Sequence, residues 1–66
     1  MRITVNNEPR DLPDGSTLAD LLRELGLDAT PCAAEINKTL IPKRDHAEHQ
    51  LCEGDTIELV TLVGGG

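Results

Sequence analysis

A stripe of leucines at residues 18–25 constrains the fold of this chain more than any other sequence feature. The stripe has four members: Leu18, Leu21, Leu22 and Leu25. This spacing places the four side chains on one face of an α-helix and leaves polar residues on the other. Thr17 and Asp20 match a capping box at the start of the helix, and Gly26 supplies the left-handed residue that often ends one. The stripe therefore predicts one amphipathic helix whose apolar face must be covered by a second layer.

Short strand patterns on both sides of the helix provide this second layer. Alternating or β-rich segments bounded by turn residues predict strands at residues 2–5, 10–12, 32–37, 39–41 and 56–63. Residues 6–9 form the turn of the first predicted hairpin, and Asn37 and Lys38 form the turn of the second. A single helix covers only one face of such a sheet. The expected fold class is therefore α+β, with a mixed sheet of four to five strands packed on one helix.

Composition narrows the class of partner. The 66 residues are enough for one domain with a small core. Twelve acidic and six basic residues give a net charge of −6, which phosphate backbones repel, and the absence of aromatic residues leaves no surface on which bases could stack. We therefore expect a protein partner with a basic docking face, and no nucleic acid.

The start of the sequence indicates the cellular compartment of the protein. It enters a strand pattern directly from Met1, without the apolar segment of a secretory signal, and it contains no stretch long enough to span a bilayer. We therefore expect a cytoplasmic protein that does not bind membranes. We expect Cys32 and Cys52 to be reduced there and to act as small apolar side chains; the alternative is a disulfide between them.

Motifs for catalysis or metal binding are scarce. His46, His49 and Cys52 recur three residues apart and could meet on one side of a helical turn to bind zinc. This set offers only three ligands and matches no recognised finger spacing, so we expect no metal. Lys43 and Arg44 nearby form either a solvated loop or a salt bridge to a partner. With no catalytic triad and no phosphate-binding glycine loop in the sequence, we expect a protein that is not an enzyme.

The last predicted strand presents two different faces. Alternation places Ile57, Leu59 and Thr61 on one face and Glu58, Val60 and Leu62 on the other. If the first face meets the leucine stripe, the second lies on the open side of the sheet, where it forms a docking patch for a partner. The alternative is that a loop or the edge of the chain covers Val60 and Leu62.

Three glycines, Gly64, Gly65 and Gly66, follow this strand after Val63, which we expect to act as a hinge. Glycine lets a backbone bend freely and pass close to another surface, so such a tail fits a narrow channel. The tail is either a frayed end or the working part of the molecule. The organisation we expect is one folded domain at residues 1–63, with a flexible tail at residues 64–66.

Five segments together carry a resemblance to a known family: VNNE, DGSTLADLLRELGL, AAEINKTLIPK, LCEGDTIELVTLV and the terminal GGG. Their order and content resemble the sulfur carrier protein of thiamin biosynthesis, the ThiS family, over essentially the whole chain. The resemblance implies a ubiquitin-like β-grasp fold and a C-terminal glycine that is converted to a thiocarboxylate. Carried onto this sequence, the modified residue is Gly66.

The resemblance also implies the partners. An E1-like adenylyltransferase of the ThiF type adenylates the terminal carboxylate with ATP, and a persulfide derived from a cysteine desulfurase delivers the sulfur. The thiocarboxylate then supplies the sulfur of the thiazole ring at a thiazole synthase of the ThiG type. The carrier itself binds no cofactor, is a monomer when free, and acts as a protein cosubstrate.

Three other interpretations use the same features. A sulfur carrier of molybdopterin synthesis shares the fold and the Gly-Gly end, but such proteins are typically longer and richer in aromatic residues than this chain. A ubiquitin-like modifier would join the same glycine to a lysine of a target protein. A plain interaction domain would leave the tail without any chemistry.

Overall fold

The elements of the fold follow one another as a hairpin, a helix, a second hairpin and a final strand. The computed structural model describes residues 1–62. The strands are β1 (Arg2–Val5), β2 (Glu8–Asp11), β3 (Cys32–Ile36), β4 (Thr39–Ile41) and β5 (Thr56–Thr61). The helix α1 spans Leu18–Glu24, and a 3₁₀ turn, η1, spans Lys43–Asp45. No helix in this part of the chain has the length and apolar character needed to span a membrane.

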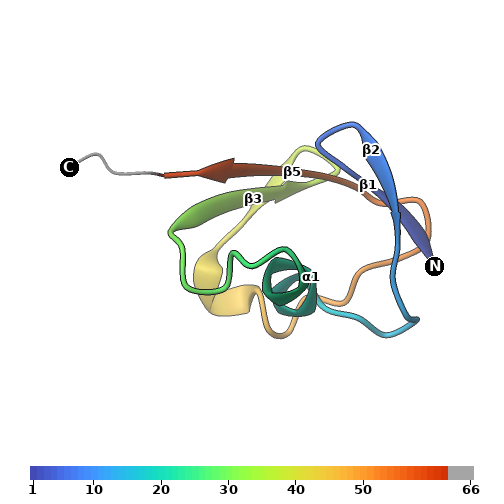
Figure 1. The fold of residues 1–66 in the computed structure, drawn as a ribbon, viewed down its shortest axis with the longest axis horizontal. Helices are drawn as coiled ribbons and strands as arrows, with labels where there is room; N and C mark the ends of the chain where they lie inside the picture. The colour runs from blue at the N-terminus through green and yellow to red at the C-terminus, as the bar shows by residue number, and fades with distance from the viewer. Residues whose placement is uncertain (63–66) are drawn as a thin grey trace.

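The five strands form one mixed sheet in the order β2-β1-β5-β3-β4. β1 and β5 are parallel, and the other neighbours are antiparallel. Figure 1 shows that α1 lies across one face of this sheet. The last strand in the sequence is thus the central strand in space. The arrangement confirms the predicted class, a mixed sheet packed on one helix, and the sheet has five strands within residues 1–62.

The core lies between α1 and the face of the sheet that the helix covers. Three leucines of the stripe, Leu18, Leu21 and Leu22, are buried, and Leu25 is partly buried. The buried residues that the sheet contributes are Ile3, Val5, Ala34, Ile36, Ile41, Ile57 and Leu59. Burying one aliphatic side chain of this size contributes about 1.5–3 kcal/mol. The stripe is therefore the main attachment of the helix to the sheet.

Both ends of α1 form as the sequence predicts. The Asp20 amide donates to the Thr17 hydroxyl at 3.1 Å, and the Thr17 amide donates to the Asp20 carboxylate at 2.9 Å. The hydrogen bond from the Thr17 backbone is the main cause that lowers the pKa of the Asp20 carboxyl. At the other end Gly26 has a φ of 74°, and the Leu27 amide donates to the Leu22 carbonyl at 2.8 Å. The capping box and this Schellman-type ending fix the length of the helix.

The first hairpin differs from the prediction in its turn. The sequence predicts a four-residue turn and a strand that begins at Arg10, whereas the turn has two residues and β2 begins at Glu8. Asn6 and Asn7 have φ values of 49° and 71°, which is the positive pair that a type I′ turn requires. Pro9 lies within β2, which is an edge strand. The prediction is wrong because an edge strand tolerates a proline whose missing N–H faces away from the ladder.

The second hairpin and its turn form as predicted. Asn37 and Lys38 have φ values of 50° and 71°, so this turn has the same backbone type as the first. The strand that follows, β4, ends before Pro42. The final strand is shorter than the predicted 56–63, because β5 ends at Thr61 and residue 63 lies outside the described residues.

Candidate functional site at the end of the last strand

Strand β5 precedes the C-terminal glycines, so its surroundings define the candidate site. β1 pairs only with the first two residues of β5, whereas β3 pairs with it at five positions, as far as Thr61. The Leu62 amide then donates to the Pro31 carbonyl at 2.9 Å. The last described residues before the tail are thus held from the β3 side.

The side chain of Asn6 takes the place of β1 where that strand ends. The Leu59 amide donates to Asn6 Oδ1 at 2.9 Å, and Asn6 Nδ2 donates to the Leu59 carbonyl at 3.3 Å. At the start of β5, the Thr56 amide donates to Asn37 Oδ1 at 3.0 Å. Each turn asparagine therefore satisfies backbone groups of the strand that would otherwise lack a partner. From the sequence, Asn6 and Asn37 can be recognised only as turn residues. Their hydrogen-bond partners on β5 lie 53 and 19 residues away in the chain.

The two faces of β5 differ as the alternation predicts. Ile57 is fully buried and Leu59 nearly so, whereas Val60 is 59% exposed and Leu62 is 56% exposed. Glu58 is exposed on the same side as Val60. The alternative that a loop covers Val60 and Leu62 is therefore wrong for the described part of the chain. The face is free, and its use as a docking patch stays a prediction.

Thr61 is the exception to the predicted division. It belongs to the covered side of β5 by alternation, yet it is exposed. Together with Leu25, Leu27 and Leu59 it lines an open pocket of about 370 Å³. Thr61 is the last residue of β5, and Figure 1 shows that this end of the strand extends past α1.

Leu40 is a surface residue that the sequence does not reveal. At 62% exposure it is the most exposed of the large apolar side chains described. It lies in β4, which has three residues and is too short to show a period. The structure buries its neighbour Ile41, and the alternation of the strand therefore places Leu40 on the opposite side of the sheet.

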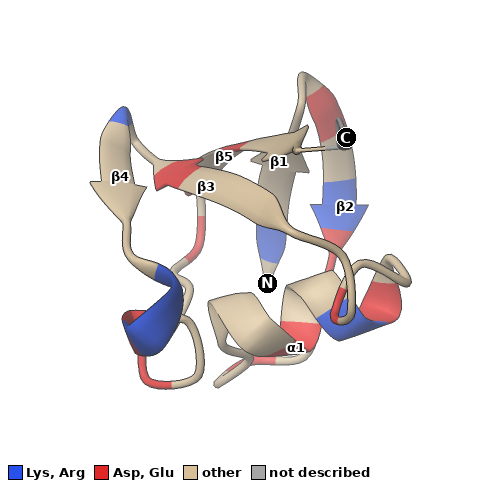
Figure 2. Cartoon of the chain, turned by 90° about the vertical axis from the view of Figure 1, so that its left-hand side faces the viewer, with Lys and Arg blue, Asp and Glu red and all other residues tan. Residues whose placement is uncertain are grey.

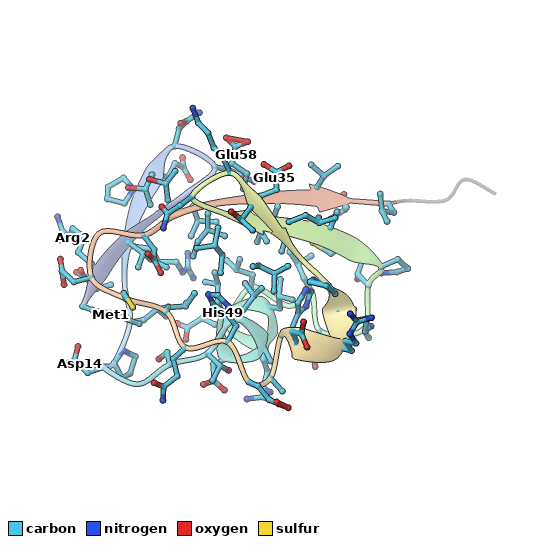
Figure 3. The ribbon with its side chains drawn as sticks, turned by 180° about the vertical axis from the view of Figure 1, so that it is seen from behind. Met1, Arg2, Asp14, Glu35, His49 and Glu58 are labelled. Atoms are coloured by element: carbon cyan, nitrogen blue, oxygen red, sulfur yellow. The ribbon has the colours of Figure 1, made fainter. Side chains whose placement is uncertain are left out.

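The register of the sheet places Leu40 in a row with two acidic residues. Leu40 pairs with Glu35 on β3, and Glu35 pairs with Glu58 on β5. The next row on the same face, two residues along each strand, pairs Val60 with Ala33. Figure 2 shows the acidic positions of β3 and β5 side by side, and Figure 3 shows the labelled Glu35 and Glu58 on the side of the sheet away from α1. We call this surface the open face; it consists of Ala33, Glu35, Leu40, Glu58, Val60 and Leu62.

The structure shows where the histidine and cysteine residues of the possible zinc site lie. His46 is buried, and its Nε2 lies 3.0 Å from the Ile41 carbonyl. Cys32 and Cys52 are both free, and Cys52 is exposed instead of being packed as a small apolar side chain. Within residues 1–62, no group of three His, Cys, Asp or Glu side chains is placed to hold a metal ion. His46 thus anchors the loop that follows β4.

The basic pair Lys43 and Arg44 lies away from the open face. Both residues are exposed on η1, and Arg44 Nε lies 4.0 Å from Asp45 Oδ1. Figure 2 shows η1 in the layer of α1, on the opposite side of the sheet from Glu35 and Glu58. A salt bridge from this pair to a partner stays a prediction.

The reactive residues predicted from the sequence lie beyond the described chain. Val63, the predicted hinge, and the tail residues Gly64, Gly65 and Gly66 are outside residues 1–62. The preceding residue, Leu62, follows the central strand and belongs to the open face.

The family of the chain follows from its similarity to known proteins. The model of the ThiS family matches residues 3–66, nearly the whole sequence. The chain belongs to the ThiS family. The sulfur carrier protein ThiS of Escherichia coli is 30% identical over 66 residues, which cover all of both chains. A thiazole synthase of Paramagnetospirillum magneticum is 36% identical over 66 residues, but there the chain spans only 20% of the length of the longer protein.

The fold has a close counterpart among solved ThiS structures. A crystal structure of the thiamine biosynthesis protein (ThiS) from Geobacter metallireducens matches with a TM-score of 0.83 at 23% identity, over the full length of both chains. This likeness confirms the predicted β-grasp fold. The family match confirms the predicted resemblance to the ThiS family over nearly the whole chain.

Proposed function

We propose that Gly66 carries the sulfur as a thiocarboxylate, after an E1-like adenylyltransferase of the ThiF type has activated its carboxylate with ATP. The observation that carries this proposal is the position of β5 in the sheet. The central strand, which is paired on both sides at its start, ends at Thr61, and the sequence after Leu62 is Val63 followed by three glycines. A firmly held strand thus leads to the residues that must enter the partner.

Glycine suits this chemistry for physical reasons. A carboxylate is a poor electrophile, so it must first be joined to an adenylyl group, and the enzyme must exclude the water that would hydrolyse the mixed anhydride. Glycines fit a narrow channel, and the missing Cβ leaves the last carbonyl open to a sulfur nucleophile. We therefore divide the chain into a folded domain at residues 1–63 and a reactive tail at residues 64–66.

The folded domain supplies the affinity that the tail lacks. Ordering a glycine tail costs conformational entropy, which contacts elsewhere on the carrier must offset. Glu58, Val60 and Leu62 lie on the open face and precede the tail by a few residues. A partner that encloses the tail therefore reaches these three residues as well, and we propose that they dock on the adenylating enzyme.

The remaining partners follow from the same chemistry. A persulfide derived from a cysteine desulfurase attacks the adenylated carbonyl and releases AMP, which leaves an acyl disulfide. A thiol then reduces this disulfide and leaves the thiocarboxylate, from which a thiazole synthase of the ThiG type takes the sulfur. The similarity to one fifth of a longer thiazole synthase supports this pairing, because that protein has a region like this chain within its own polypeptide. The adenylating partner uses the ATP, the carrier binds no cofactor, and the reactions take place in the cytoplasm.

The adenylation step is testable on the purified chain. Incubation with ATP, Mg²⁺ and the E1-like enzyme should add one adenylyl group to the intact mass. Deletion of Gly66 should slow this addition by at least about a hundredfold, because the carboxylate then stops roughly 3.5 Å short of the reacting phosphate. The circular dichroism spectrum of the deletion variant is the control for folding. An unmodified mass of the full chain would exclude both the carrier and the ubiquitin-like modifier, since both need this activation.

The sulfur acceptor is testable in cells. A bacterial strain that lacks its own thiamin sulfur carrier should grow without thiamin when it produces this chain together with its adenylating enzyme. A molybdopterin carrier mutant should not be rescued in the same way. Rescue of the molybdopterin carrier mutant without rescue of the thiamin carrier mutant would contradict the proposed acceptor and would indicate a carrier of molybdopterin synthesis.

A further inference from the structure

The open face contains an unfavourable pair of charges. Glu35 and Glu58 are directly opposite each other in the antiparallel register of β3 and β5, and Figure 3 shows both side chains on the same side of the sheet. Like charges in this position destabilise a sheet. None of the ion pairs formed within residues 1–62 includes either carboxylate. The free carrier therefore holds two negative charges together with no cation of the described chain between them.

Apolar side chains border this pair on two sides. Leu40 lies beyond Glu35 on β4, and Val60 lies two residues beyond Glu58 along β5. Both are more than half exposed, so aliphatic surface borders the two carboxylates on these sides. Such a surface is complementary to a partner that brings apolar side chains around a single cation.

Other occupants fit this surface less well. A second copy of the chain has the same two carboxylates and the same net charge of −6, so a face-to-face dimer would bring four like charges together. A Ca²⁺ ion takes about six to eight oxygen ligands, whereas aliphatic side chains border this pair. A lysine ammonium is a strongly hydrated point charge. An arginine guanidinium is weakly hydrated and planar, and its fork of donors can bind two carboxylates at once.

We propose that the open face docks on a surface of the adenylating enzyme that presents one arginine, whose guanidinium binds Glu35 and Glu58 together while apolar neighbours cover Leu40 and Val60. The identity of this enzyme rests on the proposed function. The two carboxylates have opposite effects in the two states of the carrier. They repel each other in the free domain, and they share one cation in the complex.

Two variants and one control separate these effects. Glu35→Gln and Glu58→Gln each remove one charge of the pair and keep a side chain of nearly the same shape. Glu24→Gln removes an exposed carboxylate at the end of α1, on the other side of the molecule, and serves as the matched control. Binding to the purified E1-like enzyme is measured by isothermal titration calorimetry at two salt concentrations, and thermal unfolding is measured on the free carrier. Calorimetry reports docking independently of adenylation.

The proposal predicts opposite changes in affinity and stability. We expect Glu35→Gln and Glu58→Gln each to raise the Kd about tenfold, to weaken its salt dependence, and to raise the unfolding midpoint of the free carrier. The double variant should be no more stable than either single variant, because removing one of the two charges already abolishes the repulsion between them. A Kd within twofold of that of Glu24→Gln, or no binding by the native chain, would overturn the proposal. Binding without adenylation would instead remove the proposed function and leave the docking surface in place.

Discussion

Neighbouring residues of β5 have opposite surroundings. Ile57 and Leu59 are buried against α1, while Glu58 and Val60, each one residue further along, are exposed on the open face. The difference arises because successive side chains leave a strand on opposite sides and a single helix covers one side only. One strand therefore supplies both part of the core and the surface offered to a partner. Substitutions at nearby positions should separate folding from docking.

The largest effect is expected on the buried side of β5. Ile57→Asp places a carboxylate at a fully buried position among aliphatic side chains. The cost of several kcal/mol is comparable with the whole stability of a small domain, about 5 kcal/mol. We expect this variant to lack a cooperative unfolding transition in circular dichroism. A folded Ile57→Asp variant would contradict the assignment of the buried and exposed faces of β5.

The same change three residues later should leave the fold intact and weaken docking. Val60→Asp alters an exposed position, so its unfolding midpoint should stay within a few degrees of the native value. We expect at least about a tenfold rise in the Kd for the adenylating enzyme, because a charge is brought into the apolar part of the interface. Calorimetry measures this Kd. Unchanged affinity combined with lost stability would reverse our description of the strand.

A smaller effect should come from the asparagine that holds β5 in place. Asn6→Gly tolerates the positive φ of the turn but removes both hydrogen bonds to Leu59, so we expect a loss of about 1–2 kcal/mol in the free energy of unfolding. Asn7→Gly is the matched control, since Asn7 has a positive φ and its side chain makes no hydrogen bond within the described chain. Denaturant titration measures both. Equal losses in the two variants would show that the Asn6 amide contributes nothing.

The smallest effect concerns the cap of the helix that covers Ile57. Hydrogen bonding to Thr17 lowers the pKa of Asp20 in the folded state, below the unfolded value of about 3.9. Ionised Asp20 therefore stabilises the fold above that pH, and this stabilisation is lost as the pH falls through the folded pKa. We expect Asp20→Asn to unfold at a slightly lower temperature at neutral pH and to differ less from the native chain at about pH 2. Parallel curves at all pH values would contradict this role, and binding to the enzyme should not change.

The buried side of the molecule could be predicted from the sequence because its signals are local. Four leucines at helical spacing, a capping box and Gly26 define α1 within ten residues, and they form as expected. The turn at Asn37 and Lys38 is likewise a short-range signal. The one local error, at Pro9, comes from a property of edge strands that depends on sheet order and not on neighbouring residues.

The open face could be predicted only in part, because it depends on register. The alternation of β5 is long enough to place Val60 and Leu62 on the exposed side. Leu40 lies in a strand too short for a period, and its row with Glu35 and Glu58 exists only once β4, β3 and β5 are aligned. The two hydrogen bonds of Asn6 to Leu59 are hidden in the same way, because they join residues 53 positions apart.

The proposal that Gly66 carries the sulfur is tested most directly by measuring the chemical state of this residue after sulfur transfer. The full chain is incubated with ATP, the adenylating enzyme, a cysteine desulfurase, cysteine and a thiol reductant, and the masses of its proteolytic peptides are then measured by mass spectrometry. We predict that one oxygen is replaced by one sulfur in the peptide that ends at Gly66, and that the peptides with Cys32 and Cys52 keep their mass. An unchanged C-terminal peptide, or sulfur added to either cysteine instead, would contradict the proposal.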